Sequence, residues 1–223
     1  MNNKNIEAIE SLIEKGIYSV NFNQPKWAQS FFLKVIDCFI NDNTKNVLEC
    51  GIGTGFWIKL LFSKYPYIKF YGFDLSDKMI ELAKKNLNFF SQILIKKGNI
   101  LDTESFCFDD VSMFDVIFCY DVIQQLSSED YLKAIYQMLS HASKNGLVII
   151  FDNEKFSFYS FKMTFKKTIT KFLKIPLVPL EFCNVRYPSL NYLKKEIEKN
   201  GYECQLLVAP NRIKRALIIF NKT

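Results

Sequence analysis

Short apolar runs alternate with stretches of helical periodicity through most of the chain, and this alternation predicts an α/β protein. Seven runs rich in Val, Ile, Phe or Tyr predict strands at residues 46–50, 68–74, 93–97, 114–120, 146–151, 203–209 and 216–220. Helical patterns between them predict helices near residues 55–64, 76–90, 128–141 and 189–200. Suitable capping residues for these helices are Ser76, Ser127 or Ser128, and Gly201.

Two segments fall outside this alternation. Residues 1–40 predict two helices that form a cap before the first strand. Residues 154–186 form an insertion into a core made of residues 41–153 and 187–223. A length of 223 residues fits one large domain that carries such an insertion. We therefore expect residues 1–223 to form a single domain.

The insertion is both basic and aromatic. Residues 154–174 contain six lysines and one glutamate. Helical spacings of three and four predict one aromatic face, made of Phe158, Phe161, Phe165, Ile169 and Phe172. One interpretation is a lid helix whose aromatic face packs on the core and whose lysines are solvated. The others are a clamp on an anionic substrate, and contact with an anionic membrane surface through residues 155–174.

Composition narrows the class of protein. With 49% hydrophobic residues and 23% charged residues, the chain is typical of a globular protein. No apolar run reaches 18 residues, and the first residues lack the apolar core of a signal peptide, so we expect a cytoplasmic protein. The net charge is +6, but only three of the 29 basic residues are arginine, and nucleic acid is not an expected partner.

Cysteine and histidine usage argues against a metal site. The six cysteines form no CxxC pair, which also argues against a disulfide framework, and we expect them to be buried free thiols. His141 is the one histidine of the chain. It follows a predicted helix, where an imidazole commonly contacts the terminal carbonyl groups. We therefore predict no bound metal and a structural role for His141.

A glycine loop follows the first predicted strand in the segment VLECGIGTG, residues 47–55. Glycines in such a loop allow a tight turn and the close approach of a ligand. Asp74 ends the next predicted strand, 19 residues after Gly55. A carboxylate there can accept hydrogen bonds from two ribose hydroxyls. Phe56 stands where a dinucleotide fingerprint has its third glycine, so a nicotinamide-dependent dehydrogenase is disfavoured.

The chain resembles the class I S-adenosylmethionine-dependent methyltransferases, closely over residues 44–153 and more loosely over residues 187–223. The matching segments are VLECGIGTG, FYGFDLSDKMIELAKKNL, GNILD, FDVIFCYDVIQQL, NGLVIIFD and LKKEIEKNGYECQLL. This resemblance implies a three-layer Rossmann-like α/β fold with a seven-stranded sheet, mostly parallel, in which the last strand is antiparallel. It also implies S-adenosyl-L-methionine as cofactor and S-adenosyl-L-homocysteine as product.

The resemblance assigns cofactor-binding residues position by position. The methionine end of the cofactor would lie against Glu49, Gly51, Gly53 and Gly55. Asp74 would hold the ribose, and the adenine would be lined by Leu75, Met79, Asn99 and Ile100. Tyr120 would face the sulfonium or the reacting methyl group. Asn99 stands where relatives usually have an acid, and an ordinary Gly-Asn turn is the other interpretation of that position.

The catalytic and substrate residues are less well specified. Many relatives have histidines after the fourth strand, where this chain has Gln124 and Gln125. Asp121, beside the expected methyl position, and Tyr120 are the candidate catalytic residues. Substrate contacts are expected from Tyr18, Trp27, Gln125, Arg186 and Tyr187. Each of these residues also has a structural interpretation. Asp121 could cap the turn after the strand, Tyr18 and Trp27 could pack on the core, and Arg186 could form a surface ion pair.

The sequence thus predicts an S-adenosylmethionine-dependent methyltransferase that transfers the methyl group in line to a small or medium metabolite. If the basic lid contacts the acceptor, we expect that acceptor to be anionic, with a sugar or a phosphate group. Methylation of a lipid or a protein terminus is the second hypothesis. A third is a non-catalytic cofactor-binding or interaction protein that kept the fold. The acceptor atom, the oligomeric state and the pathway do not follow from the sequence.

Overall fold

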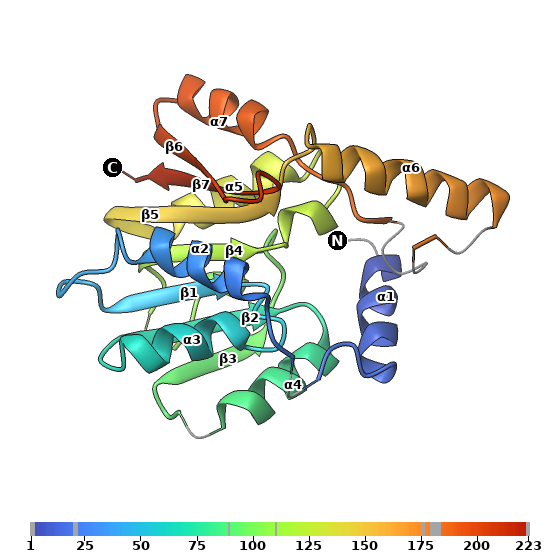
Figure 1. The fold of residues 1–223 in the computed structure, drawn as a ribbon. Helices are drawn as coiled ribbons and strands as arrows, with labels where there is room; N and C mark the ends of the chain where they lie inside the picture. Colours follow the sequence, from blue (N-terminus) through green and yellow to red (C-terminus); the bar gives the residue numbers. More distant parts are fainter. Residues whose placement is uncertain are drawn as a thin grey trace.

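Seven strands form one sheet in the order β3-β2-β1-β4-β5-β7-β6 (Figure 1). The computed structural model describes residues 3–19, 22–88, 90–109, 111–174, 177–178 and 184–221. The strands are β1 (Asn46–Cys50), β2 (Lys69–Asp74), β3 (Ile93–Lys97), β4 (Phe114–Tyr120), β5 (Ala142–Asn153), β6 (Glu203–Val208) and β7 (Lys214–Phe220). The first five pair in parallel, whereas β7 pairs antiparallel with both β5 and β6. The predicted Rossmann-like sheet with an antiparallel last strand is confirmed.

Helices cover both faces of the sheet. On one face pack α2 (Lys26–Ile36), α3 (Phe56–Lys64) and α4 (Asp77–Leu87). The other face carries α5 (Tyr131–Ser140), α7 (Leu190–Lys199) and the short 3-10 turn η1 (Thr103–Phe106). Successive strand residues point to opposite faces, so Val47 joins the first core and Leu48 the second. The three predicted layers are therefore confirmed.

Parallel pairing brings the strand ends to one edge of the sheet. Cys50, the last residue of β1, lies opposite Phe73 of β2 on one side and Cys119 of β4 on the other. The loops that follow β1, β2 and β4 therefore emerge together, which is where ligands bind in open α/β sheets. The segments outside the layers are α1 (Asn3–Glu14), the 3-10 turn η2 (Ile123–Gln125) and α6 (Phe158–Leu173).

Several predicted boundaries were wrong for local reasons. β5 begins at Ala142 rather than at residue 146, because its first residues are polar and Asn145 has a positive φ of 63°. The third predicted helix begins only at Tyr131, because Ser127 turns back to Asp130 through a 2.8 Å hydrogen bond. Ser76 caps α4 as predicted, since its hydroxyl accepts from the Met79 N–H at 3.3 Å.

The N-terminal segment divides between two roles. α2, expected as part of a cap, packs in the core instead, with the Phe32 ring 4.4 Å from Trp57 and 5.0 Å from Phe151. α1 lies outside the layers, and its acids reach the start of α4. Glu10 accepts from Ser76 at 3.2 Å, and Glu14 pairs with Lys78 at 2.6 Å. Only the first helix thus fits the description of a cap.

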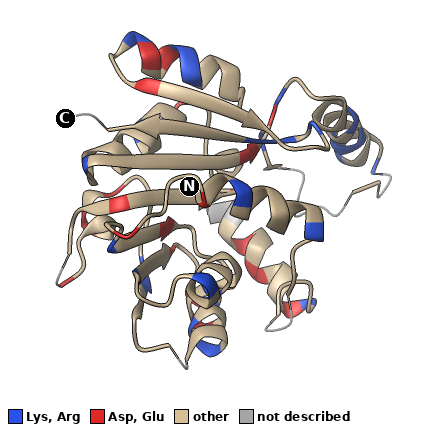
Figure 2. Cartoon of the chain, turned by 60° about the vertical axis from the view of Figure 1, so that its left-hand side comes forward, with Lys and Arg blue, Asp and Glu red and all other residues tan. Residues whose placement is uncertain are grey.

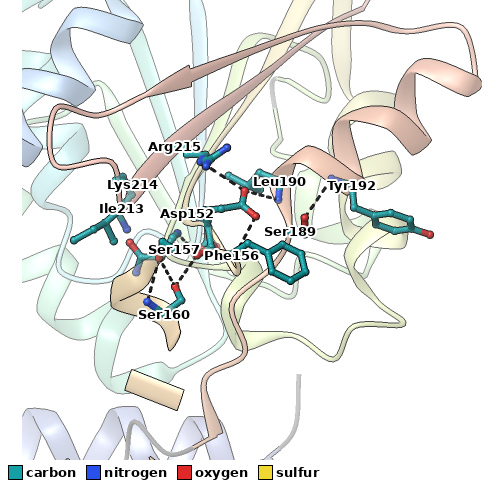
Figure 3. Close-up of polar contacts among 12 residues, drawn as sticks. Asp152, Phe156, Ser157, Ser160, Ser189, Leu190, Tyr192, Ile213, Lys214 and Arg215 are labelled. Atoms are coloured by element: carbon teal, nitrogen blue, oxygen red, sulfur yellow. Dashed lines mark hydrogen bonds and ion pairs between the residues drawn. The ribbon is translucent and has the colours of Figure 1, made fainter. Parts of the chain in front are cut away.

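Buried Glu154 fixes the start of the insertion. Figure 3 shows its surroundings, with Ser157, Ser160, Leu190 and Arg215 labelled. Its carboxylate accepts from the Leu190 N–H at 3.2 Å and lies 3.7 Å from the Arg215 side chain. Its backbone carbonyl accepts from Ser160 of α6 at 2.6 Å, and the Ser157 hydroxyl caps that helix. The end of β5, the starts of α6 and α7, and β7 are thereby joined at one buried residue.

Not every expectation for the insertion and the thiols is met. The aromatic face of α6 points to solvent, so the interpretation in which it packs on the core was wrong. Cys38 and Cys107 are exposed rather than buried, and Cys183 lies outside the described residues. His141 contacts the Gln137 carbonyl at 2.8 Å, as its structural role predicts. Among the described residues, no helix is both long and apolar enough to cross a membrane.

Candidate active site

A cavity of about 490 Å³ opens at the edge where the parallel strands end. The loops after β1, β2, β3 and β4 form one wall, and residues from the N-terminal segment, α6 and the segment before α7 complete it. Its acidic side chains are Glu49, Asp74 and Asp121, and its described lining contains no lysine or arginine. The cavity therefore suits a ligand that carries positive charge or none.

Asp74 holds the glycine loop against the start of α4. Its carboxylate accepts from the Gly53 N–H and from the Ser76 N–H, each at 3.0 Å. Burial raises the pKa of Asp74, and these backbone donors oppose that shift. Gly53 has a φ of +53°, and an added Cβ would meet nothing within 4 Å. The loop thus offers bare backbone beside a carboxylate whose remaining lone pairs can accept hydroxyl donors.

Gly55 serves packing rather than the cavity. It precedes α3 with a φ of +77°, and an added Cβ would lie 2.6 Å from the Leu87 side chain of α4. It does not line the cavity, whereas Gly51 and Gly53 do. The expected contact of Gly55 with a ligand is therefore not supported, because this glycine lets the two helices approach each other.

Glu49 places an unsatisfied carboxylate oxygen in the cavity wall. Its side chain is 1% exposed, and its Oε2 atom has no hydrogen-bond partner among the described residues. Burial, with the nearby charge of Asp74, raises the pKa of Glu49 well above its usual range. A buried acceptor without a partner is costly, so this position favours a cationic or hydrogen-bond-donating ligand group.

The expected adenine pocket lies beside Asp74. Leu75, Met79, Asn99 and Ile100 all line the cavity. The Asn99 side-chain oxygen accepts from the Leu101 N–H at 3.1 Å. Asn99 is therefore a turn residue that also lines the cavity, and its contact with an adenine stays a prediction.

A compact charge cluster closes the other end of the cavity. Asp121 follows β4 with a positive φ of 60°, a conformation that costs energy for a residue with a side chain. Its carboxylate accepts from the buried Lys214 ammonium, which also lies 4.6 Å from the Tyr120 ring centroid. Tyr120 itself packs between aromatic rings: its ring centroid lies 4.3 Å from that of Trp57 and 5.6 Å from that of Phe151. This end of the cavity is thus rigid and aromatic.

Asp152 adds a second acid to this cluster from the end of β5. It is fully buried, and its carboxylate accepts from the Gln124 N–H at 3.0 Å and from the Asn153 N–H at 2.7 Å. Burial, with the charge of Asp121, raises the pKa of Asp152 to about 8, although Lys214 opposes the shift. Asp152 is therefore mostly protonated at neutral pH.

The predicted substrate residues divide between two sites. Tyr18, Gln125 and Tyr187 line the cavity. Trp27 does not, because it is 41% exposed at the start of α2, whose buried face begins at Ala28. Arg186 lines an adjacent cleft instead, and its backbone N–H donates to the Gln124 carbonyl at 2.8 Å. The expected contacts of Trp27 and Arg186 with the same substrate are not supported.

Sequence reasoning missed several residues of the site. They are Phe22, Gln24, Phe56, Trp57, Asn153, Tyr159 and Met163 in the lining, and Lys214 and Asp152 behind it. Asp152 stood at the end of the matched segment NGLVIIFD, which was a usable signal. Lys214 gave none, because only the antiparallel pairing of β7 with β5 brings it to Asp121.

Comparison with known proteins identifies the domain. Residues 47–146 match a family model described as a methyltransferase domain. Over 62 residues the chain is 36% identical to the demethylmenaquinone methyltransferase of Thermotoga maritima. The aligned segment covers 28% of this chain and 25% of that protein. Over residues 47–146 the chain is therefore similar to methyltransferase domains, in agreement with the resemblance stated above.

Solved structures show the same fold as this methyltransferase domain. An O-methyltransferase family protein from Burkholderia thailandensis superposes with a TM-score of 0.66 at 12% identity, covering 88% of this chain and 57% of that one. The human N-acetylserotonin methyltransferase in complex with SAM gives a TM-score of 0.59 at 14% identity, covering 81% of this chain and 48% of that one. The chain spans only a quarter of the curated relative above and about half of these structures.

The charge cluster predicts a specific pH dependence of stability. Because the pKa of Asp152 is about 8 in the folded state and lies near its ordinary value of 3.8 in the unfolded state, only the folded state holds this proton between those values. The contribution of Asp152 to the free energy of unfolding is therefore largest near pH 4, falls as the pH rises to about 8 and is level above it. Urea unfolding measures this effect. As the pH rises across this window, the free energy of unfolding of the parent should fall relative to that of Asp152→Asn. A pH-independent difference would contradict the assignment.

Proposed function

We propose that this chain is an S-adenosylmethionine-dependent methyltransferase that acts on a small or medium acceptor. One observation carries the proposal. One cavity joins the glycine loop and Asp74 at one end to Tyr120, Asp121 and the aromatic walls at the other. A cofactor and an acceptor bound in these two halves would lie side by side, with their reacting atoms held together.

The chain's own residues fit this cofactor. The unpartnered Oε2 atom of Glu49 is suited to the ammonium group of the methionine moiety. The Asp74 carboxylate, already oriented by two backbone donors, is suited to the ribose hydroxyls. Leu75, Met79 and Ile100 supply apolar contact for the adenine ring. When bound, S-adenosylmethionine supplies a methyl group activated by its sulfonium.

Aromatic side chains align the reacting groups and exclude water. Tyr120 is held by its stacked neighbours, and burial raises the pKa of its phenol, which therefore stays protonated. A protonated phenol donates a hydrogen bond and does not act as a base. Tyr18 and Tyr187 cover the acceptor half from the N-terminal segment and from the segment before α7.

Asp121 is the proposed proton acceptor. Its carboxylate lines the cavity, and the strained backbone and the Lys214 ion pair hold it in place. Buried Lys214 also compensates the negative charge of that carboxylate. Asp121 would take the proton of an alcohol or phenol acceptor, while S-adenosylmethionine would supply the methyl group and leave as S-adenosylhomocysteine.

We propose an uncharged acceptor group in preference to an anionic one. The described lining of the cavity carries no lysine or arginine, whereas the amides of Gln125 and Asn153 can orient a polar group. The basic side chains that favoured an anionic metabolite face away from this cavity or line the adjacent cleft. The reacting part of the acceptor is therefore expected to be apolar or aromatic with a neutral hydroxyl or amine.

The role of Glu49 can be tested with two cofactor fragments. S-adenosylhomocysteine carries the amino acid moiety, whereas methylthioadenosine lacks it. If Glu49 pairs with the ammonium group, Glu49→Gln should weaken binding of S-adenosylhomocysteine by about 10- to 100-fold, the range for a charge-assisted hydrogen bond, and leave methylthioadenosine binding unchanged. Calorimetry measures both affinities. An equal loss for both ligands would place Glu49 in a structural role instead.

The role of Asp121 can be separated from binding. Asp121→Asn keeps the shape of the side chain but removes the base, so kcat for an alcohol acceptor found by screening should fall by roughly 10²- to 10⁴-fold. The affinity for S-adenosylhomocysteine should stay unchanged. Exposed Asp102→Asn is the matched control and should leave kcat at the parent value. A parental kcat in Asp121→Asn would show that no proton passes to this carboxylate.

A further inference from the structure

α6 presents its polar residues to the protein. Ser160, Lys167 and Thr170 are its buried residues, and the Lys167 ammonium donates to the Val185 carbonyl at 2.9 Å. The same ammonium lies 4.4 Å from the Tyr187 ring centroid. The buried side chains of α6 are therefore all polar, unlike those of an ordinary surface helix.

The opposite side of α6 is an aromatic stripe. Phe158, Phe161, Phe165 and Phe172 are 84%, 72%, 61% and 81% exposed. At 100° per residue these four side chains share one face, and the 16-residue helix is about 24 Å long. Exposed apolar patches of this kind mark interaction sites, because removal of apolar surface from water is favourable. Figure 1 shows α6 extending beyond the sheet, where such a face is accessible.

Positive charge flanks the stripe on both sides. Lys162 and Lys166 lie on one flank by helical spacing, and both are outside the buried face. On the other flank is a second cleft of about 950 Å³, whose lining includes Lys155, Lys171 and Arg186. Its one described acid is Glu129. Figure 2 shows the basic residues (blue) along the helix that lies apart from the sheet.

We propose that α6 docks on a bilayer surface that contains anionic phospholipids. The phenylalanines would enter the boundary between headgroups and acyl chains, and the flanking cations would contact lipid phosphates. A second copy of the chain is a poorer occupant, because the same face would place two sets of lysines against each other. This docking surface is independent of methyl transfer, although Tyr159 and Met163 of the same helix line the cavity.

Vesicle sedimentation tests the proposal. The parent should bind vesicles of phosphatidylglycerol mixed with phosphatidylcholine, and not vesicles of phosphatidylcholine alone. Lys162→Gln/Lys166→Gln should weaken binding on the order of 30-fold, since each lysine at an anionic surface contributes a factor of about 5. Phe161→Ala/Phe165→Ala should weaken binding at least tenfold. The matched controls, Lys84→Gln/Lys85→Gln on α4 and exposed Tyr67→Ala, should bind like the parent.

Three results would overturn the proposal: no binding to anionic vesicles, equal binding to both vesicle types, or parental binding by both α6 variants. A dimer in analytical ultracentrifugation that Phe161→Ala/Phe165→Ala converts to monomer would assign the face to a second copy instead. Circular dichroism and titration with S-adenosylhomocysteine verify that each variant is folded. Because vesicle binding is measured without any acceptor, its failure leaves the proposed methyl transfer untouched, and the reverse also holds.

Discussion

The carboxylate of Asp74 is the constraint on which the site depends. Parallel pairing of β1 with β2 brings the glycine loop and the start of α4 to the same edge, and Asp74 accepts a backbone N–H from each. Without these two bonds, Gly53 would lose the partner that fixes its left-handed turn. The loop could then no longer present bare backbone to the cavity. Fold and binding surface are thus linked through one half-buried side chain.

Glu154 has a similar structural role at the start of the insertion, where it is buried. Glu154 ties the end of β5 to the starts of α6 and α7 and to Arg215 of β7. This fixes α6 so that Tyr159 and Met163 reach the cavity while its phenylalanines face outward. One helix thereby contributes a wall of the cavity and carries the proposed docking surface on its other side.

Sequence reasoning named the residues at the glycine-loop end of the cavity because that end is local in sequence. Gly51, Gly53 and Asp74 stand at fixed positions after two consecutive strands, and the parallel sheet alone brings them together. The other end was predicted only in part, because it is assembled from distant segments: Asp121 and Tyr187 were expected there, whereas Lys214 was not. Lys214 reaches Asp121 across 93 residues of sequence.

The amphipathic pattern of residues 158–172 also led to one wrong prediction. The spacing of the aromatic residues in 158–172 predicted a helix correctly, but not which side of it would be buried. Burial was decided by Glu154 and by the contact of Lys167 with Val185, neither of which leaves a periodic signal. Likewise Gly55 fits the ligand-loop pattern, yet its position is set by contact with Leu87.

The most direct test of the account is calorimetric titration of the purified protein with S-adenosylhomocysteine, with Asp74→Ala and NADH in parallel. The account predicts binding of S-adenosylhomocysteine in the micromolar range or tighter, loss of that binding in folded Asp74→Ala, and no heat with NADH. Binding of NADH with no heat from S-adenosylhomocysteine would contradict it and would assign the glycine loop to another ligand.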